Sequence, residues 1–425
     1  MTSHRKCIFA VIDGLGDLPV ESLGGRTPLE AAKTPVLNHL AGTGTFGLVD
    51  PVSPGLIPNT HSGTGLLFGA LPEQVTQLHR GPVEALGAGM NLANGDIAMR
   101  ANFATVERHG SSFQVIDRRA GRISESTEEL ANTLQQMDLG DGVRAGLQPT
   151  DQHRAALILS GPGLDARVSD TDPGDGNIPC AVRKSEALSP AAALTADKLN
   201  RFVEMAHERL QHLEINRRRE ARGQLPANGI ITRGAGVMRD FDNVLGERGI
   251  SAAVVAGCNT IRGLARSSGF DVISEPAFTA DLDTDIDAKM RAALSALREY
   301  ELVYVHFKAP DICAHDLDPD AKRDALERFD RALAAVAEAG VMIAVGSDHT
   351  TDSNTGAHTA DPVPVLLHDP HTPLPRDDGE VNFSERACAS GKLPRRTGHV
   401  FLTELLGRLS VSGSACAEHC ARSDW

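Results

Sequence analysis

The alternation of short apolar runs with amphipathic segments constrains the fold of this chain more than any other feature. Residues 6–13 (KCIFAVID) form an apolar run that ends in Asp13 before a glycine, as expected for a strand buried on both faces of a sheet. Similar runs follow at residues 155–161, 229–232, 251–257, 270–274, 301–307, 341–347 and 362–368. Helical patterns lie between them, at residues 189–213, 259–268, 284–299 and 319–339. This order predicts an α/β fold with a mostly parallel sheet flanked by helices.

The length of the chain and the distribution of its charges indicate a second domain. With 425 residues, 41% of them hydrophobic, the chain exceeds the usual size of one domain. The region from residue 111 to 270 is richer in arginine and has its own strands and helices, whereas the acidic and histidine clusters lie outside it. We therefore expect a catalytic, metal-binding domain built from residues 1–110 and 271–425, and a smaller inserted α/β domain at residues 111–270.

Composition and charge exclude several classes of partner. A formal net charge of −14 repels nucleic acids and anionic membrane surfaces, and no apolar run approaches the roughly 20 residues that span a bilayer. The first apolar run is too short for a signal-peptide core, and the seven cysteines are scattered without C-x-x-C pairs. We expect a reduced, cytoplasmic protein. Its oligomeric state stays open, a homo-oligomer included.

Acidic and imidazole side chains stand next to the predicted strands. A D-x-x-x-H motif follows the strand at 301–307, and a D-H pair follows the strand at 341–347. One aspartate ends the first strand, and one histidine precedes the run at 362–368. The six residues are Asp13, Asp311, His315, Asp348, His349 and His358. Because ligand sites in open α/β sheets form beyond the carboxyl ends of the strands, we expect these side chains to meet at one edge.

This set of side chains has the chemistry of a metal centre. Asp and His suit Zn²⁺, Mn²⁺ or Fe²⁺, and six such residues are more ligands than one ion takes, so two divalent ions are expected. Two ions about 3.5–4 Å apart can clamp the attacking and leaving oxygens of an in-line displacement, as in many phosphoryl-transfer enzymes. The alternative is that the pairs merely cap helices or bond backbone amides. Their recurrence at several strand ends favours the metal centre.

Ordered motifs along nearly the whole chain carry a family resemblance. They include AVIDGLGD at 10–17, GGRTPLEAAKTPVLNHLA at 24–41, RGPVEALGAGMNL at 80–92, ANFATV at 101–106, DRRAGRI at 117–123, SDTDP at 169–173, RGAG at 233–236, LDTD at 282–285, KAPDICAH at 308–315, SDHT at 347–350 and AHTADPVPV at 357–365. In these motifs the chain closely resembles the cofactor-independent phosphoglycerate mutases of the archaeal type, within the alkaline phosphatase superfamily. The resemblance implies an alkaline-phosphatase-like sheet with an inserted lid domain.

The resemblance also implies how the site is arranged. One ion would be held by Asp311, His315 and His358. The other would be held by Asp13, Asp348, His349 and the oxygen of the nucleophile, with Mn²⁺ expected and Zn²⁺ or Mg²⁺ as alternatives. The family nucleophile is a serine in a segment that corresponds here to residues 55–69, and Thr60 stands at its place. Its hydroxyl would take the phosphoryl group of a small phosphorylated acid and return it to a different hydroxyl of that substrate.

Two positions beside the expected nucleophile depart from the family pattern. An acidic residue directly after the nucleophile and a histidine four residues after it are replaced by His61 and Thr64, and Ser62 is a rival nucleophile two residues away. The imidazole of His61 could act as an acid or a base near neutral pH. These changes leave the substrate open. A metal-dependent phosphatase or phosphonate-processing enzyme, and an inactive binding protein that kept the fold, are the alternatives.

Basic residues are the candidates for binding an anionic substrate. Arginine makes forked contacts with phosphate and carboxylate, and an acidic protein needs local positive charge to hold a phosphorylated acid. A lid that carries these residues would close over the site and exclude water. The candidates are Arg118, Arg119, Arg122, Arg154 and Arg233 in the inserted region, and Lys308 just before a metal ligand.

Overall fold

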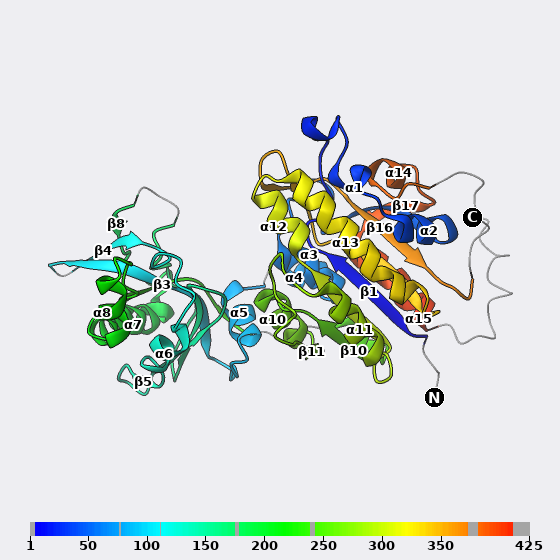
Figure 1. Ribbon diagram of the computed structural model, residues 1–425. Helices are drawn as coiled ribbons and strands as arrows, with labels where there is room; N and C mark the ends of the chain where they lie inside the picture. Colours follow the sequence, from blue (N-terminus) through cyan, green and yellow to red (C-terminus); the bar gives the residue numbers. More distant parts are fainter. Residues whose placement is uncertain are drawn as a thin grey trace. The chain divides into compact units, whose positions relative to one another are not determined.

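The computed structural model describes residues 5–75, 78–110, 112–174, 178–238, 243–372 and 381–410. The chain divides into two compact units, each drawn in Figure 1. The first unit comprises Met1–Gln77 and Phe241–Trp425, and the second comprises Leu78–Asp240. The second unit is thus inserted in the first. No helix among the described residues has both the length and the apolar character needed to cross a membrane.

The first unit contains an eight-stranded sheet in which β16 alone runs against the other strands. The strands, in spatial order, are β11 (Asp271–Ile273), β10 (Ala252–Val255), β12 (Leu302–Phe307), β1 (Cys7–Ile12), β13 (Met342–Gly346), β16 (Val363–His368), β2 (Thr45–Asp50) and β17 (Leu393–Thr397). The predicted α/β fold class with a mostly parallel sheet is therefore confirmed. A separate two-stranded hairpin, β14 (Thr350–Asp352) and β15 (Ala357–Thr359), follows β13.

Helices cover both faces of this sheet. Alternate residues of β1, such as Ile8 and Ile12, pack in a core that includes side chains of α2 (Pro35–Thr43), α11 (Ile286–Ala296) and α13 (Pro319–Ala337) (Figure 1). Phe9 packs instead with Tyr304 and with Phe401 of α15 (Gly398–Leu409). The remaining helical elements of this unit are η1 (Glu21–Leu23), α1 (Pro28–Ala31), α3 (Thr60–Leu67), α4 (Pro72–Val75), α9 (Val244–Glu247), α10 (Asn259–Ser267), α12 (Ala309–His315) and α14 (Glu385–Ala389).

The second unit contains a sheet in which every pairing is antiparallel. Its strands are β5 (Met137–Asp138), β6 (Arg144–Pro149), β7 (Arg154–Ser160), β3 (Ile97–His109), β4 (Ser112–Asp117) and β8 (Cys180–Ala181), and β9 (Gly229–Val237) pairs with β3. Its helices are α5 (Arg80–Gly87), α6 (Thr127–Asn132), η2 (Pro190–Ala192), α7 (Ala193–Leu210) and α8 (Glu214–Ala221). The apolar runs at 155–161 and 229–232 thus belong to an antiparallel sheet rather than to the parallel one.

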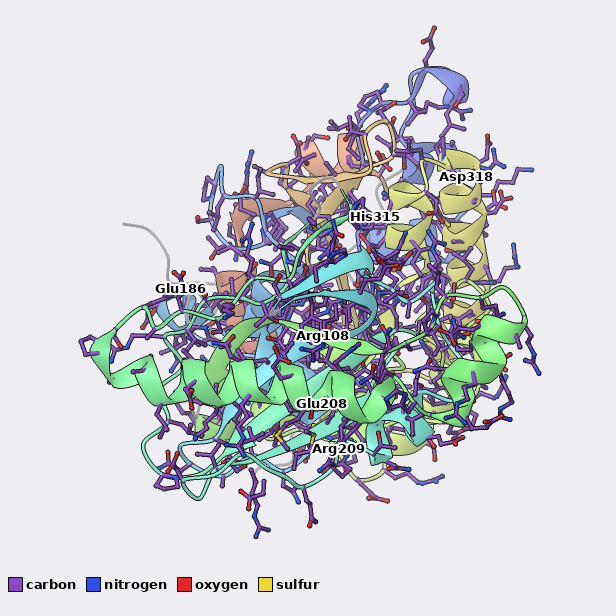
Figure 2. The ribbon with its side chains drawn as sticks, turned by 90° about the vertical axis from the view of Figure 1, so that its left-hand side faces the viewer. Arg108, Glu186, Glu208, Arg209, His315 and Asp318 are labelled. Carbon is purple, nitrogen blue, oxygen red and sulfur yellow. The ribbon has the colours of Figure 1, made fainter. Side chains whose placement is uncertain are left out.

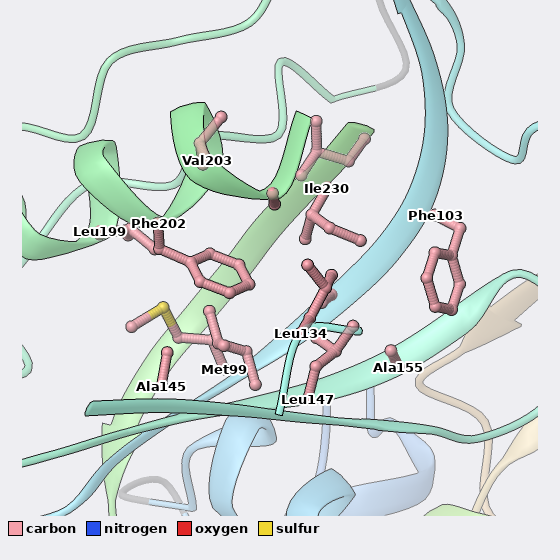
Figure 3. Close-up of a cluster of buried hydrophobic side chains, with 14 of the residues drawn as sticks. Met99, Phe103, Leu134, Ala145, Leu147, Ala155, Leu199, Phe202, Val203 and Ile230 are labelled. Atoms are coloured by element: carbon pink, nitrogen blue, oxygen red, sulfur yellow. The ribbon is translucent and has the colours of Figure 1, made fainter. Parts of the chain in front are cut away.

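The core of the second unit lies between this sheet and α7. Met99 and Phe103 of β3 pack in one cluster with Phe202 of α7, as Figure 3 shows (Figure 3). On its other side α7 exposes Glu208 and Arg209, which are labelled in Figure 2 (Figure 2). The helix is therefore amphipathic, and its apolar stripe is what holds it on the sheet.

The unit boundaries differ from the expected junctions at 110/111 and 270/271. Residues 78–110 lie in the second unit because β3 pairs along most of its length with β7 and β9. Residues 243–270 lie in the first unit because β10 pairs with β12. Composition could not locate these junctions, since strand pairing between distant segments decides them.

Candidate active site

The six acidic and imidazole side chains singled out in the sequence lie together at one edge of the large sheet. They form two groups of possible ligands, and within each group the ligand atoms lie within 4.8 Å of one another. The groups are Asp311, His315 and His358, and Asp13, Asp348 and His349. The parallel strands β1, β12 and β13 bring their carboxyl ends to this edge. The reversed strand β16 brings its amino end there, and with it the hairpin strand that carries His358.

Each of the three histidines is oriented by a hydrogen bond at its Nδ1 atom. The partners are the hydroxyl oxygen of Thr351 for His349 (3.0 Å), the carbonyl oxygen of Gly356 for His315 (2.6 Å), and the carbonyl oxygen of Pro58 for His358 (3.2 Å). A carbonyl oxygen only accepts, so the Nδ1 atoms of His315 and His358 carry the proton. Their Nε2 atoms are then available as metal ligands, as metal-binding histidines usually require.

The Nε2 atoms point at carboxylates. In the first group, Nε2 of His315 and of His358 lies 3.3 and 3.5 Å from Oδ1 of Asp311. A neutral imidazole with its proton on Nδ1 has a lone pair on Nε2, which would repel a carboxylate oxygen at this distance. A cation between the donor atoms removes this repulsion, so the residues fit a divalent metal ion such as Mn²⁺ or Zn²⁺.

The second group is more deeply buried and strongly charged. Asp13, Asp348 and His349 have no exposed surface, and Nε2 of His349 lies 3.2 Å from Oδ1 of Asp13 and 3.3 Å from Oδ2 of Asp348. Burial opposes protonation of His349, but the carboxylates of Asp348 and Asp13 outweigh it and raise the pKa of the imidazole to about 9. Burial and the charge of Asp13 raise the pKa of Asp348 to about 6. Excess negative charge is thus held away from water, which is the situation that a bound cation stabilises.

Lys308 lies between the two groups. Its Nζ atom donates to Oδ2 of Asp13 (2.9 Å) and to Oδ2 of Asp311 (2.7 Å), and Nε2 of His306 lies 3.0 Å from the same oxygen of Asp13. Burial alone would raise the pKa of Asp13, but Lys308, His306 and His349 overcome it and hold this pKa well below its usual range. The ammonium group therefore keeps one carboxylate of each group ionised.

Thr60 is a hydroxyl residue that faces a ligand histidine. It is the first residue of α3, and its Oγ1 atom lies 3.4 Å from Nε2 of His349. Asn59 caps the helix by accepting a hydrogen bond from the backbone N–H of Ser62, whose hydroxyl bonds back to the backbone of Asn59. The Ser62 hydroxyl is thus used in the cap. Thr60 directly follows the N-cap residue, and His61 follows Thr60 in the first turn with a partly buried side chain.

Close packing holds α3 against Asp348. A Cβ atom on Gly63 would lie 2.0 Å from the carbonyl oxygen of Asp348, so no larger residue fits there without a shift. The buried hydroxyl of Thr64 donates to Oδ2 of Asp348 (3.4 Å), and the hydroxyl of Tyr304 donates to the carbonyl oxygen of Leu67 (2.8 Å). Thr64, in place of the family's histidine, therefore contacts a ligand carboxylate.

Arginines gather on one face of the sheet in the second unit. Arg100 in β3 pairs directly with Arg233 in β9, and Asn102, two residues on, pairs with Arg154 in β7. Because side chains alternate along a strand, these residues share the face opposite to the core residues Met99 and Phe103.

The arginines of this cluster lie close enough for their positive charges to disfavour one another. Arg80, at the start of α5, joins it and lies 3.4 Å from the carboxylate of Glu84. Burial, with the nearby charge of Arg80, lowers the pKa of Arg100 to about 9. The buried Nε atoms of Arg100, Arg154 and Arg233 make no hydrogen bond within the described part of the chain. Guanidinium groups with such unused buried donors have the chemistry that an anion requires.

The structure separates the other arginines singled out in the sequence. Arg118 is bonded by two of its nitrogens to the carboxylate of Asp172, at 2.8 and 2.6 Å, whereas Arg119 and Arg122 are exposed. Arg80 and Arg100 were missed. A signal for Arg100 existed, since it is a charged residue at an alternate position of an apolar run, where a buried functional group is indicated.

Comparisons with known proteins show the family to which the chain belongs. A family model described as 2,3-bisphosphoglycerate-independent phosphoglycerate mutase matches residues 41–216. The chain is 40% identical to the protein of that name from Methanopyrus kandleri, covering 97% of this chain and 99% of that one, and 39% identical to that from Ignicoccus hospitalis, covering 91% and 94%. The solved structure of the cofactor-independent phosphoglycerate mutase from Thermoplasma acidophilum is similar, with a TM-score of 0.66, 31% identity, and coverage of 96% of this chain and 100% of that one. The PH0037 protein from Pyrococcus horikoshii is also similar, with a TM-score of 0.79, 30% identity, and coverage of 97% and 100%. The chain therefore belongs to the 2,3-bisphosphoglycerate-independent phosphoglycerate mutases, a family of isomerases.

Proposed function

We propose that this protein moves a phosphoryl group between two hydroxyls of a small phosphorylated acid of the phosphoglycerate type, with Thr60 carrying the group in between. The observation that supports this most is the approach of the Thr60 hydroxyl to His349, 3.4 Å away, at the edge of two groups of metal-ligating side chains. The names of the relatives, all phosphoglycerate mutases, support the choice of substrate class.

Two divalent ions would be the cofactors. Asp311, His315 and His358 would hold one, and Asp13, Asp348 and His349 would hold the other. Bound there, such ions, with Mn²⁺ the first choice and Zn²⁺ or Mg²⁺ the alternatives, lower the pKa of a neighbouring hydroxyl and neutralise charge on a phosphoryl group.

The residues around Thr60 would carry the chemistry. The oxygen of Thr60, in its deprotonated form, would form a bond to phosphorus while the bond between phosphorus and the substrate oxygen breaks. In the second step the substrate's other hydroxyl oxygen would bond to phosphorus, and the Thr60 oxygen would leave, again deprotonated. The amides in the first turn of α3 would point at the phosphoryl oxygens. His61 would give a proton to the leaving hydroxyl and take one from the incoming hydroxyl. Lys308 has one N–H beyond its two carboxylate bonds, which would contact a phosphoryl oxygen.

The arginine cluster would bind the acid. Arg100, Arg154 and Arg233 have buried Nε atoms without a hydrogen bond among the described residues. With Arg80 beside them, their guanidinium groups would match a carboxylate or a phosphate in geometry and charge. Arg119 and Arg122 are exposed and would attract the anion from solution, whereas Arg118 would act through Asp172.

A phosphatase, or a phosphonate-processing enzyme on the same scaffold, is the second candidate. His61 favours it, because an imidazole next to the phosphorylated residue could activate water as readily as a substrate hydroxyl. The two functions differ only in the group that receives the phosphoryl group from Thr60.

The test is to incubate the protein with Mn²⁺ and 3-phosphoglycerate, then with other phosphate esters, and to follow the phosphorus NMR signals. Isomerised ester is the expected product, whereas free phosphate would indicate the phosphatase. Mass spectrometry of the acid-quenched protein should find the phosphoryl group on Thr60. Thr60→Ala should abolish both signals and Thr60→Ser should keep them. Ser62→Ala, the matched control, should cost only about 1 kcal/mol of stability through the cap. Turnover by Thr60→Ala would contradict the proposal.

A further inference from the structure

An ion pair outside the ligand groups is buried completely in the first unit. Lys322 of α13 and Asp17 have no exposed side-chain surface, and Nζ of Lys322 lies 2.7 Å from Oδ2 of Asp17. The ammonium group also donates to the carbonyl oxygens of Gly16 (3.0 Å) and Thr351 (2.9 Å). All three of its N–H bonds are therefore directed at oxygens of the protein.

These bonds join the two segments that carry the ligands of the second group. Gly16 and Asp17 belong to the loop that begins with Asp13, and Thr351 stands in β14, two residues after His349. The carboxylate of Asp17 strengthens the junction, because it accepts hydrogen bonds from the backbone N–H (2.9 Å) and the hydroxyl (2.6 Å) of Ser353.

Thr351 extends the junction to both ligand groups. Its hydroxyl donates to Oδ1 of Asp311 (2.9 Å), so its oxygen accepts the hydrogen bond from Nδ1 of His349 (3.0 Å). A Cβ atom on Gly14 would lie 2.6 Å from this oxygen, so the loop after β1 must be free of a side chain there. The position of one threonine hydroxyl thus sets the orientation of one ligand in each group.

Stability alone does not account for such a pair. Two charges that are removed from water cost several kcal/mol, and replacing a buried pair by uncharged residues of similar size is often neutral or stabilising. The pair is better explained by what it holds in place.

We propose that Lys322 and Asp17 are positioning residues for the metal centre. They hold the backbone of Thr351, and through its hydroxyl they orient His349 and Asp311 for the ions. This inference rests on the proposed function, since it needs the metal centre to exist.

The test removes both charges at once, because a single change would leave the other charge buried and unpaired. In Lys322→Met/Asp17→Asn, Mn²⁺ binding to the metal-free protein is measured by titration calorimetry, and Tm of the metal-free protein by differential scanning calorimetry. Loss of groups that orient metal ligands typically weakens binding about 10–100-fold, and we expect that loss here with a nearly unchanged Tm.

The matched control is Arg5→Met/Asp369→Asn. This ion pair joins the start of β1 to the end of β16, at the opposite edge of the same sheet. It should leave the Mn²⁺ affinity unchanged.

Unchanged Mn²⁺ affinity in the folded double variant would overturn the proposal. If that variant does not fold, Thr351→Val decides, because it keeps the ion pair and removes only the hydroxyl. The same 10-fold or greater loss is then expected, and an unaltered affinity would refute the positioning role. A wild-type protein that binds no divalent ion would instead refute the proposed function, and the positioning role with it.

Discussion

We expect the charge of Arg100 to lower the free energy of unfolding while it strengthens the binding of an anionic substrate. Burial, with the charge of Arg80, lowers the pKa of Arg100 to about 9. At pH 7 the guanidinium is protonated in both the folded and the unfolded chain, so the cost of burying it is fully present. This cost would be relieved only as the pH rises above about 9. Lowering the pKa of Arg100 to about 9 corresponds to a cost of about 5 kcal/mol in the folded state.

Arg100→Met keeps most of the side-chain stem and removes the charge. Since relaxation and water penetration reduce such costs, we expect the ligand-free variant to be more stable by about 1–3 kcal/mol. It should also lose most of the stabilisation that inorganic phosphate or 3-phosphoglycerate confers, which for the wild type would be about 2.7 kcal/mol at a ligand concentration 100 times Kd.

Calorimetry of both proteins, with and without these ligands, measures the two effects. Arg144→Met, an exposed arginine on β6 of the same unit, is the control and should change Tm little. A lower Tm of the ligand-free Arg100→Met protein, or an unchanged response to phosphate, would refute the reasoning.

Three further outcomes are expected. Gly63→Ala should abolish turnover in a folded protein, because its Cβ atom would lie 2.0 Å from the carbonyl oxygen of Asp348, whereas Gly42→Ala, with nothing within 4 Å, should be at least as stable as the wild type. His315→Ala should reduce the number of Mn²⁺ ions bound in titration calorimetry from two to one; two retained ions would contradict the assignment. Burial raises the pKa of Glu385 from 4.5 to about 7, so the folded chain binds the extra proton and stability falls as the pH rises through this window. The fall in the free energy of unfolding is about 3 kcal/mol, and Glu385→Gln should remove it. Comparing Tm of both proteins at pH 5 and pH 8 measures the difference.

The ligand groups show which parts of the site could be predicted from the sequence. Asp13, Asp311 and Asp348 could be placed at one edge because each follows a buried strand, and the carboxyl ends of parallel strands meet there. His358 lies at the same edge for a reason that the sequence did not show. Its neighbouring strand, β16, is antiparallel, so its amino end is the one that reaches the site.

Local pattern alone determined the α/β class, the strands and helices with the clearest apolar periodicity, and the residue types of a candidate metal centre, because periodicity records which side chains turn inward. Register and long-range pairing are not local properties. Only the tertiary structure therefore decided that Arg100 lies opposite Arg233, that Thr60 faces His349, and that Lys322 reaches Asp17. Each of these contacts joins residues whose positions depend on how separate elements pack, and packing is decided by the whole chain at once.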